Sequence, residues 1–115
     1  MSRITTHVLD TSSGRPAEGV PVLLERADPA GEGWEVVGRG LTDADGRQRD
    51  LAPNGRRLAG GTYRLTFDTG AYFTRTGRQA FFPQVSVVFA IEEGDEHQHV
   101  PLLLAPYGYS TYRGS

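Results

Sequence analysis

The sequence contains no cysteine, no lysine and no long apolar run. Without cysteine there can be no disulfide and no thiolate metal site. No segment approaches the roughly 20 apolar residues that a membrane-spanning helix needs. Residues 1–10 also lack the apolar stretch of a secretory signal. We therefore expect a cytoplasmic protein with no membrane partner.

The basic residues are all of one kind: the 12 side chains counted as Lys or Arg are all arginine. The net charge is nevertheless −2. Proteins that bind nucleic acid usually carry a basic stripe, and here the acidic residues offset the basic ones, so we predict no nucleic-acid partner. The planar guanidinium suits a site that binds oxygen or imide edges. A compositional bias of the genome explains the absence of lysine more simply.

Short strands separated by turn residues dominate the chain, and its length fits one domain spanning residues 1–115. Only Thr69–Thr76 has a pattern compatible with a helix. Eight short strands joined by short loops predict an all-β antiparallel sandwich or barrel. The predicted strands are Ile4–Asp10, Gly19–Ala27, Trp34–Thr42, Arg47–Leu51, Thr62–Phe67, Val85–Ile91, His99–Leu104 and Tyr109–Arg113.

Alternation along two of these strands places a histidine of each strand on the face opposite the core. In Ile4–Asp10 the core-facing positions leave His7 on the opposite face, and in His99–Leu104 they do the same for His99. The two rings can lie side by side only if their strands are neighbours in one sheet. Leucines share these outward faces, which suits a subunit interface better than solvent. The alternative is two ordinary surface histidines. The expected core-facing sets are Ile4, Thr6 and Val8, and Val100, Leu102 and Leu104.

Two short patterns are compatible with metal binding, but neither is specific. His97 and His99 share one face of a strand, and His7 could be a third ligand for zinc, yet no other partner is evident. Asp43–Gly46 resembles part of a calcium loop but lacks the EF-hand spacing and its terminal glutamate, so we predict a plain turn. No phosphate-binding glycine loop is present. We therefore predict no metal and no cofactor.

The C-terminal segment Tyr107–Ser115, YGYSTYRGS, is unusually rich in functional groups. Tyrosine and threonine favour strands, so we expect the chain to dock its own end into a sheet. That arrangement would hold Arg113, Ser115 and the terminal carboxylate in defined positions. The alternative is an ordinary edge strand with a solvated arginine.

Three segments in fixed order carry a family resemblance: ITTHVLDTSSGRPA (4–17), LTDADGR (41–47) and HVPLLLAPYGYSTYRGS (99–115). Together they resemble the 5-hydroxyisourate hydrolases, transthyretin-like enzymes of urate breakdown. The ending Tyr-Arg-Gly-Ser separates these hydrolases from true transthyretins. The resemblance implies a transthyretin-like, eight-stranded two-sheet β-sandwich with one short helix. It also implies a homotetramer, a dimer of dimers, with active sites in the channel where the dimers meet.

The resemblance also implies an active site and a metal-independent reaction, in which water attacks a ring carbonyl of 5-hydroxyisourate and a C–N bond breaks. The product is 2-oxo-4-hydroxy-4-carboxy-5-ureidoimidazoline. We expect His7 and His99 to orient and deprotonate water, with either as the base. Arg47 would face the developing negative charge, and Ser115 would relay a proton. The resemblance assigns no role to His97. The implied site residues are His7, Arg47, His99 and Ser115 for catalysis, and His7, Arg47, Tyr112 and Arg113 for substrate binding.

The main alternative function is a transthyretin-type carrier that binds a small ligand in the same channel without catalysis. A channel mouth with two histidines and an arginine suits a charged purine derivative better than an apolar hormone. The hydrolase is therefore the favoured prediction.

Overall fold

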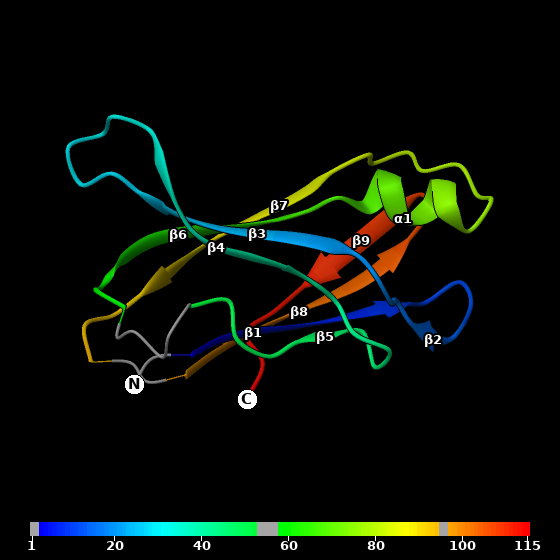
Figure 1. The fold of residues 1–115 in the computed structure, drawn as a ribbon, viewed down its shortest axis with the longest axis horizontal. Helices are drawn as coiled ribbons and strands as arrows, with labels where there is room; N and C mark the ends of the chain where they lie inside the picture. Colours follow the sequence, from blue (N-terminus) through cyan, green and yellow to red (C-terminus); the bar gives the residue numbers. More distant parts are fainter. Residues whose placement is uncertain (1–2, 53–57, 95–96) are drawn as a thin grey trace.

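Two β-sheets lie face to face in the computed structural model, which describes residues 3–52, 58–94 and 97–115 (Figure 1). One sheet has the order β2-β1-β8-β9, with β5 also paired to β1, and the other has the order β4-β3-β6-β7. The strands are β1 (Arg3–Asp10), β2 (Arg15–Pro16), β3 (Pro21–Ala27), β4 (Trp34–Leu41), β5 (Arg47–Gln48), β6 (Gly61–Phe67), β7 (Val85–Ile91), β8 (His97–Ala105) and β9 (Gly108–Thr111), and the helix is α1 (Thr69–Arg75).

The predicted two-sheet sandwich with one short helix is confirmed, with three differences in detail. The structure has nine strands, because the segment after the first turn folds back and pairs Arg15–Pro16 with the end of β1. The sandwich is not wholly antiparallel, since β1 and β8 run parallel along their length. The strand expected at Arg47–Leu51 ends at Gln48, because only Arg47 and Gln48 form ladder pairs with β1, although the backbone N–H of Leu51 still donates to the carbonyl of Ile4.

The core fills the space between the sheets and follows the alternation of the strands. Tyr63, Leu65 and Phe67 of β6 are fully buried on the inner face of one sheet. The expected sets on β1 and β8 face them from the other sheet: all six residues are buried. His7 and His99 are only partly buried, because they lie on the outer face of the β1–β8 pair. The outer face of this sheet therefore carries the polar groups.

The end of the sandwich near α1 is closed by a buried carboxylate, Asp10, which is fully inaccessible. The hydroxyl of Tyr72 in α1 donates to its Oδ2 over 2.7 Å, and the guanidinium of Arg78 pairs with the same oxygen. Ser12 and the backbone of Ser13 donate to Oδ1. Burial opposes ionisation of Asp10, but these hydrogen bonds, led by Arg78, outweigh it and hold the pKa of Asp10 well below its usual range. Asp10 thus links β1 to the helix.

We expect Asp10→Asn to lower the free energy of unfolding by about 3 kcal/mol, because it leaves the Arg78 guanidinium without its buried partner. Urea unfolding at pH 7 measures the change. Since the pKa of Asp10 is depressed on folding, its contribution is present above about pH 4 and is lost as the pH falls further. Asp28→Asn, at a partly exposed carboxylate in the β3–β4 turn, is the matched control and should change stability by less than about 0.5 kcal/mol. Equal stability of the two variants would contradict the assigned role.

In the part of the chain that the structure describes, no helix is long and apolar enough to cross a membrane. The cytoplasmic location stays a prediction.

Candidate active site

A hollow of about 260 Å³ opens on the outer face of the β1–β8 sheet, beside β5 and the C-terminal tail. Strands β1, β5 and β8 are hydrogen-bonded neighbours, so residues distant in the sequence meet there. The tail reaches the hollow because the backbone N–H of Gly114 donates to the carbonyl of His99 over 2.8 Å. The lining residues are Arg3, Thr5, Thr6, Arg47, Gln48, Arg49, His97, His99 and Ser115.

His99 is the most tightly held side chain of the hollow. Its Nδ1 lies 2.8 Å from the hydroxyl of Thr5, its direct neighbour on β1. Gly114 packs so closely on the ring that a Cβ added there would lie 2.5 Å from Cδ2. Burial lowers the pKa of His99, and electrostatic interaction with Arg47, His97 and His7 lowers it further. The ring is therefore neutral at neutral pH, and in the tautomer that carries its proton on Nδ1 the Nε2 can accept a proton.

His7 is positioned by the turn that leads into β5. Its Nε2 lies 2.9 Å from the backbone carbonyl of Asp45. Because a carbonyl can only accept, Nε2 of His7 must carry a proton, and Nδ1 is the ring nitrogen that this hydrogen bond leaves free. The turn itself is held by Asp43, whose Oδ1 accepts hydrogen bonds from the backbone N–H groups of Asp45 and Arg47. Gly46 has a φ of +76°, and an added Cβ there would lie 2.4 Å from the carbonyl oxygen of Val8.

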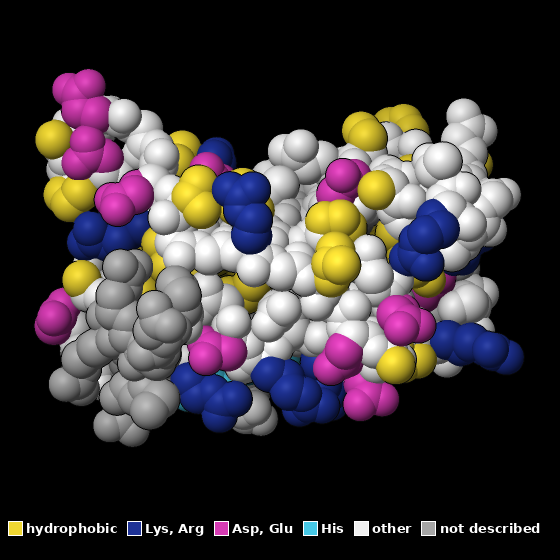
Figure 2. Space-filling view, viewed as in Figure 1, with side chains coloured by type: hydrophobic (Ala, Val, Ile, Leu, Met, Phe, Trp, Pro, Cys, Tyr) yellow, Lys and Arg dark blue, Asp and Glu magenta, His cyan; other side chains and the backbone are white. Residues whose placement is uncertain are grey.

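The hollow is electrically positive. Arg3, Arg47 and Arg49 contribute to its lining. Arg49 lies 3.7 Å from both Asp43 and Asp45, whereas Arg47 has no acidic partner within 4.0 Å among the described residues. The space-filling view shows arginine side chains along the lower edge of the molecule, where β1 and β5 lie, with part of a histidine visible beside them (Figure 2). An anion or a polar ring with several carbonyl oxygens suits this charge.

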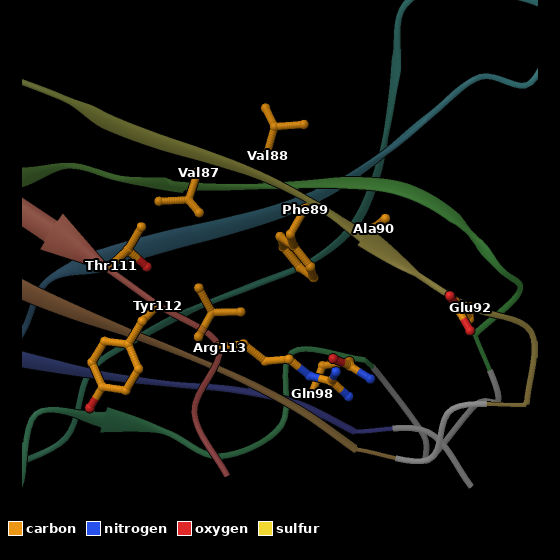
Figure 3. Close-up of a pocket in the computed structure, with 10 residues that line it drawn as sticks. Val87, Val88, Phe89, Ala90, Glu92, Gln98, Thr111, Tyr112 and Arg113 are labelled. Atoms are coloured by element: carbon orange, nitrogen blue, oxygen red, sulfur yellow. The ribbon is translucent and has the colours of Figure 1, made fainter.

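Tyr112 and Arg113 line a different hollow, of about 390 Å³, between β7 and the β8–β9 edge. Figure 3 shows the side chain of Arg113 extending toward Gln98 and the ring of Tyr112 pointing away from it. Tyr112 is 58% exposed. Of the six residues that the sequence predicted, the structure thus brings His99, Arg47 and Ser115 to one hollow, with His7 on the same face of β1. It does not bring Tyr112 and Arg113 to that hollow.

Two residues of this region carried no prediction from the sequence. Thr5 joins His97 to His99 through its hydroxyl, and Gly114 supports the His99 ring. Only their positions in the sequence could have pointed to them, since Thr5 alternates with the core residues of β1 and Gly114 lies within the terminal motif. Among residues 3–52, 58–94 and 97–115, no group of three or more His, Cys, Asp or Glu side chains could hold a metal ion.

The chain is similar to known proteins over nearly its whole length. The chain matches the HIUase/Transthyretin family over residues 4–114. The 5-hydroxyisourate hydrolase of Caulobacter vibrioides is 49% identical over 119 residues, covering 100% of both proteins. Among solved structures, Klebsiella pneumoniae 5-hydroxyisourate hydrolase superimposes with a TM-score of 0.86 at 45% identity over 100% of both chains.

A carrier of the same fold is also similar. Sea bream transthyretin, solved in complex with thyroxine, has a TM-score of 0.89 at 34% identity and covers 97% of this chain and 94% of its own. The transthyretin-like fold predicted from the sequence is therefore confirmed. With Gly114 of the terminal motif bound to His99 and the match spanning nearly all of its length, the chain belongs to the HIUase/Transthyretin family.

Proposed function

We propose that this protein hydrolyses 5-hydroxyisourate in urate breakdown, at the hollow that contains His99 and Arg47. One observation carries the proposal: a histidine with a lowered pKa lies in a positive hollow, with its Nδ1 and one ring face already held by protein. That arrangement leaves Nε2 of His99 to act on a water molecule. The relatives named 5-hydroxyisourate hydrolase support the choice of substrate.

The chemistry needs a base, a charge stabiliser and a proton donor. In the proposed reaction Nε2 of His99 takes a proton from water as the water oxygen bonds to a ring carbonyl carbon. The carbonyl oxygen becomes negative in the transition state. The C–N bond then breaks, the nitrogen receives a proton, and the former carbonyl carbon ends as a carboxylate. Ser115, at the rim of the same hollow, is the proposed proton relay.

Arg47 and His7 are assigned to the substrate. The Arg47 guanidinium lines the hollow and has no acidic partner within 4.0 Å among the described residues, so it can face the developing oxyanion. One well-placed donor of this kind contributes about 3–4 kcal/mol in comparable sites. His7, whose Nε2 is bound to the Asp45 carbonyl, is proposed to accept a hydrogen bond at Nδ1 from an N–H of the substrate ring.

We further propose that the protein assembles as a homotetramer. Within the described residues β7 pairs only with β6, and β9 only with β8, so each presents a free edge. Both edges border the same hollow, where Val88 and Tyr112 are largely exposed. Free strand edges with exposed apolar side chains favour pairing with a second copy. Such an assembly also offers Tyr112 and Arg113 a neighbouring subunit, which is how we expect them to contact substrate. Size-exclusion chromatography with light scattering tests the tetramer, and a monomer at micromolar concentration would contradict it.

The alternative function is a carrier, because a transthyretin solved in complex with thyroxine is also similar to this chain. A carrier needs an apolar channel of suitable size. The hollow described here is instead lined by arginine, histidine, threonine and glutamine side chains. This polarity favours the hydrolase.

A direct assay separates the two functions. We expect the protein to speed the loss of ultraviolet absorbance of freshly generated 5-hydroxyisourate well beyond the spontaneous rate, and EDTA to leave the acceleration intact. Heat-denatured protein at the same concentration is the control. No acceleration would favour the carrier, and sensitivity to EDTA would revive the zinc site considered from His97 and His99.

A further inference from the structure

A single hydroxyl group connects two histidines at the candidate site. On β8, His97 and His99 lie on one face, and the parallel register places Thr5 of β1 directly beside His99. The Oγ1 of Thr5 lies 2.8 Å from Nδ1 of His99 and 3.0 Å from Nε2 of His97. Thr5 is 9% exposed, so water competes little for this hydroxyl. The three side chains form a continuous hydrogen-bonded chain from an exposed ring to the candidate base.

The number of protons in this chain restricts which ring nitrogen carries one. A threonine hydroxyl donates one hydrogen bond and can accept two. The two rings therefore cannot both accept from Thr5. When the proton of Thr5 goes to Nε2 of His97, Nδ1 of His99 has to be the donor, and Nε2 of His99 is left without a proton. When the proton of Thr5 goes instead to Nδ1 of His99, Nε2 of His99 carries a proton and cannot act as a base.

We propose that His97 is a positioning residue that sets, through Thr5, which nitrogen of His99 carries the proton. Neutral His97 accepts from Thr5 and keeps Nε2 of His99 free. A charged His97 can only donate, so it removes that acceptor and allows Thr5 to donate to His99 instead. The proposal deepens the proposed function, since it rests on His99 as the base.

His7 provides an internal reference for this effect. Its Nε2 donates to a backbone carbonyl that belongs to the turn before β5, which the chain of His97, Thr5 and His99 does not include. The charged groups that face His99 are His7 and Arg3 of β1, Arg47 of β5 with Arg49 after it, His97 of β8, and the tail with the carboxylate of Ser115. A change of tautomer confined to His99 therefore indicates an effect through the hydrogen-bonded chain, whereas a change in both His7 and His99 indicates a general rearrangement of the site.

The first measurement is the tautomer of each imidazole, read from ¹⁵N chemical shifts of the full-length protein without substrate. In His97→Phe we expect His99 to move from the Nδ1–H form toward the Nε2–H form, while His7 stays unchanged. His97→Gln places an amide oxygen near the former position of Nε2 and should recover most of the original form. Thr5→Val should behave as His97→Phe does, and Thr5→Ser should recover the wild-type pattern.

The second measurement is the pH profile of kcat and of kcat/KM. Because the base must be neutral, wild-type activity should fall as the pH drops through the lowered pKa of His99, below the ordinary value of about 6.5. Both His97→Phe and His97→Gln remove the electrostatic contribution by which His97 lowers the pKa of His99, so both should move this fall to higher pH. Only His97→Phe should lower kcat on the plateau, by about tenfold, which is a fraction of what a general base supplies.

Failure of this proposal can be distinguished from failure of the proposed function. Unchanged His99 tautomer and unchanged plateau kcat in His97→Phe would overturn the proposal, as would equal losses in His97→Phe and His97→Gln. Melting temperatures of all four variants show whether each one folds. If wild-type protein fails to hydrolyse 5-hydroxyisourate, the proposed function fails, while the tautomer measurement still tests the proton placement by itself.

Discussion

Replacing His99 with alanine is expected to lower kcat by at least about 10²-fold, which is the usual contribution of a general base. The ring is the only group of the hollow with a lowered pKa, a defined hydrogen bond at Nδ1 and an Nε2 without a partner among the described residues. Its removal leaves Arg47 to stabilise charge but leaves no group poised to deprotonate water there. Stopped-flow measurement of 5-hydroxyisourate loss at pH 7.5 gives the change in kcat.

The variant should keep its fold, since His99 lies on the outer face of the sheet and contributes nothing to the buried core. His7→Ala should likewise remove most of the activity, because it deletes the second acceptor of the site. Unchanged elution volume and circular dichroism are the controls for both variants. Near-normal turnover in either variant would contradict the role assigned to that histidine.

Replacing Gly114 with alanine is expected to lower kcat by roughly 10²-fold while the fold survives. The added Cβ would lie 2.5 Å from Cδ2 of His99 and 3.2 Å from Cγ of Pro101. Favourable carbon contacts need about 3.5 Å, so the ring or the tail has to move by about 1 Å. A displacement of that size at a reacting group can cost 10²-fold in rate.

Gly108→Ala is the matched control, because Gly108 lies at the start of β9 and an added Cβ would meet nothing within 4 Å. It should retain wild-type kcat and stability. Deleting residues 112–115 should lower activity as Gly114→Ala does, because it removes the tail that contacts His99. The fold should survive the deletion, because β9 ends at Thr111 and the sheet stays intact. Full activity of Gly114→Ala, or equal losses in the two glycine variants, would show that the tail does not position His99.

Much of the architecture followed from local patterns. The strands at β6 and β7 and the helix that begins at Thr69 were predicted because side-chain period and turn chemistry are local properties. The parallel pairing of β1 with β8 was not readable. It joins residues about 94 positions apart, as in the bond from Thr6 to the carbonyl of Val100, and no local pattern encodes such a partner. The two-residue strand β2 was missed because its pairing is too short to show a period.

The candidate site also has features that the sequence predicted and features that it did not. Alternation placed His7 and His99 on outward faces, and the family resemblance supplied the roles of Arg47 and the tail. The link through Thr5 was invisible, since its partners lie on β8, and His97 was set aside although it belongs to the same hydrogen-bonded chain. The separation of Tyr112 and Arg113 from the His99 hollow depends on the direction that the tail takes after β9.

The all-β class, the core-facing positions, the family and most of the chemical groups available can be read from the amino-acid sequence, because they depend on residue type and on spacing along one strand. Which of these groups meet depends on the folded arrangement of the strands. The β1–β8 register places Thr5 between two imidazoles, and the docked tail presses Gly114 against His99. The surroundings that lower the pKa of His99 arise from burial and from charges on β1, β5 and β8 together. Hydrogen bonds and electrostatic fields depend on distance in space, and folding alone sets those distances.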